Sequence, residues 1–175
     1  VELGPHMEGR AWFPISVAAL QQTQITGTPL DLSNIVPPGL GKARQYLLEM
    51  LRELNVPISR VVLGGFSQGA MLACEVTLKL AEIPAGLAIL SGTPVNFVEW
   101  RKLAPEKKGF RFFQSHGQYD PVLSFEMAKD LNKMLVEAGW QGQLLGFQGQ
   151  HEIPFEIVSQ LGHYIRGQLG LISSK

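Results

Sequence analysis

Ser67 is the residue whose sequence surroundings most directly suggest covalent chemistry. It lies at the centre of Gly65-Phe66-Ser67-Gln68-Gly69, which fits the G-x-S-x-G pattern of a nucleophile elbow. In such an elbow, a sharp turn between a strand and a helix exposes a serine hydroxyl that can attack a carbonyl carbon. A pattern this short can arise by chance in a chain with 19 Gly residues. The rest of the sequence must therefore supply a base and an acid.

The same turn could instead bind a phosphate group, as some glycine-rich turns between a strand and a helix do. The phosphate-binding patterns G-x-x-x-x-G-K-[ST] and G-x-G-x-x-G do not occur in the sequence. A helix after Ser67 would aim its free N–H groups, including that of Gln68, at negative charge that develops near the serine. The sequence therefore favours a nucleophile over a phosphate-binding turn.

Histidine is the usual base for a serine nucleophile, because its free pKa is about 6.5. The chain has four His residues. His6 lies in an irregular N-terminal segment and His163 lies within a predicted helix, where a structural or surface role is the simpler interpretation. His116 and His151 each come at the end of a predicted strand or after one, so both are expected at the carboxyl edge of a sheet.

Asp120 is the one Asp residue that directly follows a predicted strand, and Pro121 restricts the backbone beside it. Ser67, Asp120 and His151 then occur in the order Ser–Asp–His, which is typical of α/β-hydrolases. Each lies just beyond a predicted strand, and three such coincidences are harder to obtain by chance than one pentapeptide. His116 is interpreted as a structural residue that braces the Asp120 loop.

Strands and helices are predicted to alternate along most of the chain. Short apolar runs predict strands at 60–66, 85–91, 110–116 and 143–147, and helix-like patterns predict helices at 38–54, 68–81, 124–138 and 153–168. This alternation predicts an α/β fold, a doubly wound and mainly parallel sheet with helices on both faces. In such a sheet, ligands bind beyond the carboxyl ends of the strands.

A single domain is expected over residues 1–175. Residues 1–35 are predicted to be mostly irregular, with W-F-P-I at 12–15 as an anchoring segment. The alternation of strands and helices occupies residues 36–175.

Two finer features are also predicted. Ser33 or Asn34 is expected to cap the first helix. Residues 92–109 are expected to form a loop that helps to set substrate preference, although its conformation cannot be derived from the sequence.

Composition excludes several classes of protein. The formal net charge is zero, with 15 basic and 15 acidic residues, so a broad basic field for nucleic acid or anionic lipid is excluded. Cys74 is the only cysteine, which excludes an intrachain disulfide, and its apolar neighbours predict a buried, unreactive thiol. The sequence has no apolar run of membrane-spanning length and no signal-peptide pattern, so a cytoplasmic protein is expected.

From about Arg10 onward the sequence resembles the phospholipase/carboxylesterase family of α/β-hydrolases, which includes acyl-protein thioesterases. The similar segments are A-W-F-P-I near the start, L-G-G-F-S-Q-G-A around Ser67, S-H-G-Q-Y-D-P-V around Asp120 and G-Q-H-E around His151. These segments occur in the family's order and extend over most of the chain, which makes the resemblance specific.

The resemblance implies a role for each candidate residue. Ser67 would be the nucleophile, Asp120 the acid and His151 the base of a catalytic triad. The backbone N–H of Gln68 would donate a hydrogen bond to the oxyanion.

Trp12 and Phe13 would line the acyl or alcohol side of the cleft by the same resemblance, and a role as simple core anchors is the alternative. Family members carry further strands and an L-H-G-x-G loop before this segment, and that loop supplies a second oxyanion N–H. No H-G-x-G occurs in this sequence. We therefore expect an N-terminally incomplete member that is weakly active or inactive, because losing one oxyanion donor costs about 10²–10³ in kcat.

The predicted function is a serine hydrolase that cleaves carboxylic esters through an acyl-enzyme, with thioesters as further substrates by the resemblance. This chemistry requires neither a metal nor an organic cofactor. Two alternatives remain, a non-catalytic binding protein and an acyltransferase or lyase on the same fold. The predicted partner is a small-molecule ester, and a homodimer would suit the family or an incomplete sheet edge.

Overall fold

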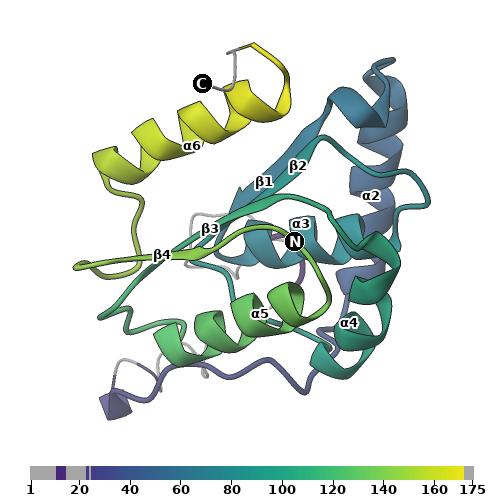
Figure 1. The fold of residues 1–175 in the computed structure, drawn as a ribbon. Helices are drawn as coiled ribbons and strands as arrows, with labels where there is room; N and C mark the ends of the chain where they lie inside the picture. The colour runs from purple at the N-terminus through teal and green to yellow at the C-terminus, as the bar shows by residue number, and fades with distance from the viewer. Residues whose placement is uncertain (1–10, 15–22, 24, 172–175) are drawn as a thin grey trace.

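A four-stranded parallel sheet forms the centre of the molecule (Figure 1). The computed structural model describes residues 11–14, 23 and 25–171. The strands are β1 (Val62–Phe66), β2 (Gly86–Leu90), β3 (Phe112–Gly117) and β4 (Leu144–Phe147), and they lie side by side in chain order. In the register Phe66 pairs with Leu90 and Gly117 pairs with Phe147, so the carboxyl ends of the strands meet at one edge.

Helices cover both faces of the sheet, as Figure 1 shows. The helices are α2 (Leu40–Glu53), α3 (Gln68–Lys79), α4 (Phe97–Leu103), α5 (Phe125–Glu137) and α6 (Phe155–Gln168). The helices between consecutive strands lie on one face, because right-handed crossovers that always move to the next strand return on the same side. Of the labelled helices in the described part of the chain, α6, which follows the last strand, is the one that lies on the other face. The predicted α/β class with helices on both faces is therefore confirmed.

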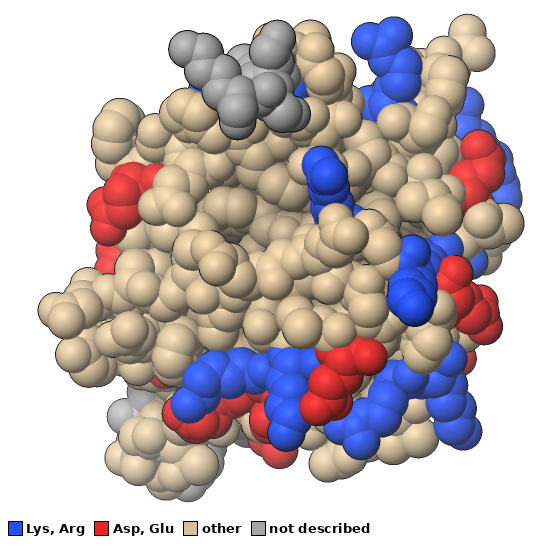
Figure 2. All heavy atoms as spheres, viewed as in Figure 1, with Lys and Arg blue, Asp and Glu red and all other residues tan. Residues whose placement is uncertain are grey.

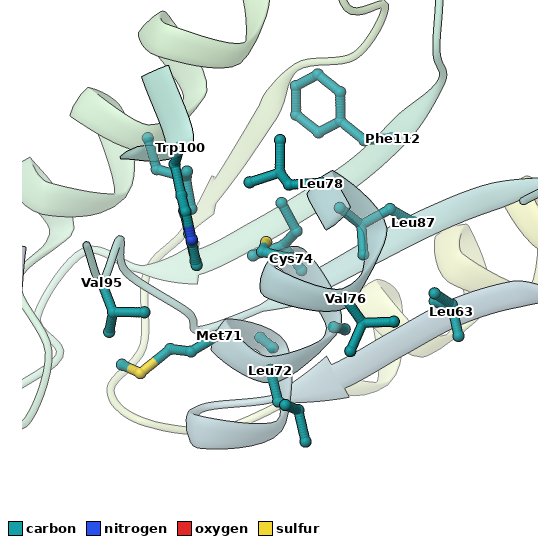
Figure 3. Packing of buried hydrophobic residues seen from close by; sticks show 14 of the residues in the cluster. Leu63, Met71, Leu72, Cys74, Val76, Leu78, Leu87, Val95, Trp100 and Phe112 are labelled. Atoms are coloured by element: carbon teal, nitrogen blue, oxygen red, sulfur yellow. The ribbon is translucent and has the colours of Figure 1, made fainter. Parts of the chain in front are cut away.

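The hydrophobic core follows the alternation of side chains along the buried strands. Leu87 and Ile89 of β2 belong to the larger cluster around α3, whereas Ala88 and Leu90 belong to a smaller cluster that includes Ile157 of α6. Figure 3 shows how side chains from the sheet and from α4 surround α3. Because residues 70–78 of α3 are all buried, this helix is the rigid support behind the turn at its N-terminus.

All eight predicted strands and helices are present, with ends that differ from the prediction by a few residues. The predicted loop at 92–109 was wrong in part, since it contains α4 and a short 3₁₀ helix, Ala104–Lys107. At seven residues α4 is too short for a periodic apolar pattern to be recognised. Its Trp100 is nevertheless fully buried.

The predicted helix cap was also wrong. α2 begins at Leu40, after Gly39 in a left-handed conformation (φ 84°), and no side chain caps it. The segment that contains Ser33 binds α4 instead: the Phe97 N–H donates to the Ser33 carbonyl, and the Asn96 N–H donates to the Ile35 carbonyl. The anchoring segment is described only at residues 11–14; Ile15 lies outside the described residues, as does His6.

Acidic and basic side chains lie next to each other on the surface. Figure 2 shows this mixture along the edge of the molecule that carries α5. On that helix Lys129 pairs with Glu126 at 2.6 Å, and Lys133 lies 3.9 Å from Glu137. Among the described residues, none of the helices has the length and apolar character needed to cross a membrane.

A buried carboxylate joins three helices. Glu75 of α3 is 1% exposed, and it accepts hydrogen bonds from Arg44 of α2 at 2.5 Å and from the Trp100 indole of α4 at 2.7 Å. Lys79 lies 3.0 Å from the same carboxylate and 2.9 Å from Glu99. The buried charge is thus compensated by two cations and one neutral donor.

Replacing Glu75 by Ala should lower the free energy of unfolding by about 3 kcal/mol, because it leaves the Trp100 N–H buried without its acceptor and breaks a buried ion pair. Glu99→Ala is the matched control, since Glu99 shares Lys79 but is more exposed, and it should cost less than about 1 kcal/mol. Urea unfolding of both variants measures the difference. Equal losses would contradict the role given to Glu75.

Candidate active site

Three loops at the carboxyl edge of the sheet carry the predicted site residues. Ser67 directly follows β1, Asp120 lies in the loop after β3, and His151 lies in the loop after β4. In the structure His151 lies between the other two residues and within hydrogen-bond distance of both. The Ser67 Oγ lies 2.9 Å from His151 Nε2, and His151 Nδ1 lies 2.7 Å from Asp120 Oδ2.

The turn at Ser67 is a strained elbow. Ser67 has φ 54° and ψ −119°, a conformation that residues with a side chain rarely adopt. Its N–H donates to the Leu90 carbonyl of β2 at 2.8 Å, which fixes the turn against the sheet. A Cβ atom at Gly65 would overlap the backbone of Gly69, so the chain can reverse this tightly only with glycine there.

The requirement for glycine is one-sided. A Cβ atom at Gly69 would meet only the Trp12 Nε1, at an ordinary contact distance of 3.7 Å. The G-x-S-x-G pattern therefore combines a strict steric requirement at its first glycine with a weaker one at its last.

The loop that carries His151 lies across the ends of the neighbouring strands. Hydrogen bonds tie it to the Asp120 loop, from the Gln118 N–H to the Phe147 carbonyl and from the Tyr119 N–H to the Gly149 carbonyl. A side chain at Gly117 would overlap the Gln150 carbonyl, so this glycine lets the loop pass close over β3.

Both ring nitrogens of His151 have partners, and those partners determine its tautomer. Because a carboxylate only accepts, Nδ1 carries the proton toward Asp120, and Nε2 is left to accept from the Ser67 hydroxyl. The Phe66 ring lies 4.7 Å from the imidazole, centroid to centroid. The His151 side chain is 18% exposed, so it can be reached from solvent.

Asp120 is a buried carboxylate with a full set of donors. Oδ1 accepts from the N–H groups of Val122 and Leu123, at 2.8 and 2.9 Å, and Oδ2 faces both His151 and His116. Burial raises the pKa of Asp120, but the hydrogen bonds from His116, from His151 and from the two backbone N–H groups outweigh burial. The pKa therefore lies well below its usual range, and the group is an anion at neutral pH.

Gln68 contributes through its backbone and its side chain. Its N–H is the first of α3 and lies beside the Ser67 turn, where the helix N-terminus favours negative charge. Its side-chain amide accepts from the Trp12 N–H at 2.7 Å and donates to the Phe13 carbonyl at 2.8 Å. These two hydrogen bonds to the 12–13 segment could not be predicted from the sequence, because nothing in the pattern around Ser67 indicates a partner 55 residues away.

A groove of about 560 Å³ runs beside Ser67 along β1. Trp12, which is 43% exposed, lines this groove together with Gln68 and apolar residues of α2 and β1. Phe13 lies differently, since its side chain is fully buried in the main core. Of the two aromatic residues predicted at the cleft, Trp12 is thus the one that faces open space.

The described part of the chain contains no cluster of three His, Cys, Asp or Glu side chains suited to a metal ion. Cys74 is buried in α3, as the sequence predicts. Burial, with a further contribution from the neighbouring Glu75 charge, raises the pKa of its thiol. A buried thiol whose pKa is raised in this way is a poor nucleophile.

Comparison with known proteins shows the family to which the chain belongs. Residues 4–169 match the sequence profile of a family described as phospholipase/carboxylesterase. The chain belongs to the phospholipase/carboxylesterase family.

Named members of this family are partly similar in sequence. The chain is 28% identical to acyl-protein thioesterase 1 of Candida albicans over 102 residues, which are 56% of this chain and 44% of that protein. It is 23% identical to acyl-protein thioesterase 1 of Neurospora crassa over 144 residues, 78% of this chain and 59% of that protein. The chain thus spans about half the length of the curated relatives that it matches.

Solved structures share the fold of this family member. Arabidopsis thaliana SOBER1 superposes with a TM-score of 0.71 at 22% identity, over 91% of this chain and 74% of that one. The carboxylesterase of Bacillus cereus superposes with a TM-score of 0.58 at 16% identity, over 74% of this chain and 60% of that one. At these identities the likeness shows the α/β-hydrolase fold.

Gly65→Ala should destabilise this phospholipase/carboxylesterase family member by about 3 kcal/mol, because the new methyl group overlaps the Gly69 backbone. Gly69→Ala is the control: it adds the same methyl group in open contact at the first turn of α3, where Ala suits a helix better than Gly. Thermal unfolding of both variants tests this asymmetry. Similar unfolding temperatures would refute the one-sided steric requirement.

The depressed pKa of Asp120 predicts a specific dependence of stability on pH. The folded-state pKa lies below the unfolded value of about 3.9, so the carboxylate stabilises the fold fully above that value, and this contribution is lost as the pH falls through the folded pKa. The gap in unfolding free energy between the wild type and Asp120→Asn should therefore be larger at pH 7 than at pH 3. Chemical denaturation at both pH values measures it, and a gap that is constant or grows on acidification would contradict the assignment.

Proposed function

We propose that this protein is a serine hydrolase that cleaves carboxylic esters through an acyl-enzyme intermediate. The observation that carries the proposal is the continuous hydrogen-bonded chain from Ser67 through His151 to Asp120. These residues come from three separate loops, and Ser67 and His151 are 84 positions apart in the sequence. Nucleophile, base and orienting acid in this order and geometry form the arrangement that acyl transfer requires.

Each residue has a defined role in the proposed reaction. His151 Nε2 accepts the proton of the Ser67 hydroxyl as Oγ attacks the acyl carbonyl, and the Asp120 anion stabilises the imidazolium that forms. The carbonyl oxygen becomes an oxyanion and accepts a hydrogen bond from the Gln68 N–H. The imidazolium then returns its proton to the leaving alcohol, and the acyl group remains on Ser67.

The second half of the reaction uses the same groups. His151 removes a proton from a water molecule, the water oxygen attacks the acyl-enzyme, and the carboxylic acid leaves as Ser67 regains its proton. Only one oxyanion donor, the Gln68 N–H, is assigned to the described residues here. Because each donor of such a site is worth about 10²–10³ in kcat, a second donor would raise turnover by a factor of that size.

The proposed substrates are esters of small acyl groups, and the groove beside Trp12 is where we place the acyl or alcohol group. Thioesters are a second proposed class, supported by the relatives that are named acyl-protein thioesterases. An acyltransferase would form the same acyl-enzyme, and analysis of the products in the presence of an added alcohol separates it from a hydrolase. A protein that only binds its ligand would form no acyl-enzyme.

Ser67→Ala should reduce hydrolysis of p-nitrophenyl acetate to background and abolish labelling by a fluorophosphonate, because no other group replaces the nucleophile. Removing the serine of a triad costs on the order of 10⁶ in kcat. Ser159→Ala, which alters an exposed serine of α6, is the matched control and should hydrolyse and label like the wild type. Undiminished labelling of Ser67→Ala would show that another nucleophile carries the activity.

A further inference from the structure

We infer that His116 is a positioning residue of the site, a second imidazole that holds the Asp120 carboxylate in the orientation that His151 requires. This inference rests on the proposed function. His116 lies in β3 and is fully buried. Its Nε2 lies 2.9 Å from the Leu123 carbonyl oxygen and 3.2 Å from Asp120 Oδ2.

The partners of the His116 ring define its protonation. A carbonyl oxygen can only accept, so Nε2 carries a proton that it shares between the Leu123 carbonyl and Asp120. Nδ1 is buried and has no hydrogen-bond partner among the described residues. A proton on Nδ1 would create a charged ring with a buried, unpaired N–H, which is costly, so the neutral ring protonated on Nε2 is the stable form.

A neutral donor at this place has two geometric effects. It joins the two ends of the tight loop at 120–123, because the same N–H binds the carboxylate at one end and the carbonyl at the other. It also completes the coordination of Asp120, with two donors on Oδ1 and two on Oδ2. Four donors restrict the rotation of the carboxylate, which keeps the oxygen that faces His151 in place.

The electrostatic effect of His116 separates positioning from simple packing. Each hydrogen bond that a carboxylate accepts lowers the negative charge density on its oxygen atoms. Without the His116 donor, Asp120 would place more of its charge at His151 and hold the His151 proton more tightly. The loss of His116 should therefore raise the pKa of His151, an effect that a merely structural residue would not produce.

Other charged groups do not account for such an effect. Neighbouring elements present uncharged groups to His116: β4 places Gly146 beside it in the register, and the Phe125 ring of α5 lies 6.2 Å away. Two further carboxylates near the site have partners of their own: Glu126 of α5 pairs with Lys129, and Glu152, which follows His151, accepts from the Gln150 N–H. Asp120 and His151 are thus the titratable groups through which His116 acts.

NMR titration of the four imidazoles in ¹⁵N-histidine-labelled protein tests this inference without relying on turnover. The His151 signal is assigned with a His151→Ala sample. In His116→Leu, which removes the donor, the titration midpoint of His151 should rise by about half a pH unit. In His116→Gln, whose amide nitrogen reaches the position of ring Nε2 and can donate to Asp120, the midpoint should return toward the wild-type value.

Kinetics with p-nitrophenyl acetate give the second readout. His116→Leu should lose about tenfold in kcat, the equivalent of one hydrogen bond, and the acid limb of its kcat/KM profile should move to higher pH. His116→Gln should recover most of the rate. If His116→Leu does not fold, His116→Asn, whose shorter amide does not reach Asp120, replaces it in both measurements.

The outcomes separate this inference from the proposed function. An unchanged His151 midpoint in a folded variant without the donor would overturn the role of His116, whatever the activity. A shift that His116→Gln does not reverse would overturn it too, because the donor would then not be the cause. A wild type without Ser67-dependent hydrolysis would refute the proposed function, while the NMR midpoints would still decide whether His116 positions Asp120.

Discussion

The site depends on the register of the parallel sheet. Because neighbouring strands pair with their ends aligned, the residues that follow β1, β3 and β4 emerge at one edge. β1 and β4 are nevertheless three strand spacings apart, about 14 Å. The loop after β4 must therefore cross β3 and β2 to bring His151 to Ser67. Gly117 lets the loop pass close to the end of β3, and hydrogen bonds from the Asp120 loop hold it there.

Much of this arrangement could be predicted because it follows from local patterns. Apolar runs of strand length between helical patterns determine the fold class, and the strand–turn–helix context of Ser67 follows from glycines at fixed offsets. Asp120 and His151 could be placed at the same edge because each follows a strand, even though their contact with Ser67 is long-range. The prediction succeeded where a residue's position in an element is enough to place it.

The features that escaped prediction depend on tertiary packing. α4 is short, and its one fully buried large residue, Trp100, is held by Glu75 of another helix, a pairing that no periodicity reveals. The Gln68 side chain forms two hydrogen bonds with the 12–13 segment, which is far from it in the sequence. Gly39 precedes α2 in place of a capping side chain, and the Ser33 segment is bound to α4 through backbone hydrogen bonds. In each case the partner, and not the residue itself, decides the structure.

Among the described residues, two carboxylates are buried, Glu75 and Asp120. They are stabilised in different ways, and the difference bears on chemistry. Glu75 is paired with Arg44 and Lys79, whose positive charges cancel its own and make it a structural link. Asp120 is held by backbone N–H groups and by imidazole N–H groups, which are neutral in the resting state. Neutral donors fix a carboxylate without cancelling its net charge. In the proposed reaction, a cation beside Asp120 would oppose the positive charge on His151, so neutral donors would keep the anion available to stabilise the imidazolium when Ser67 loses its proton.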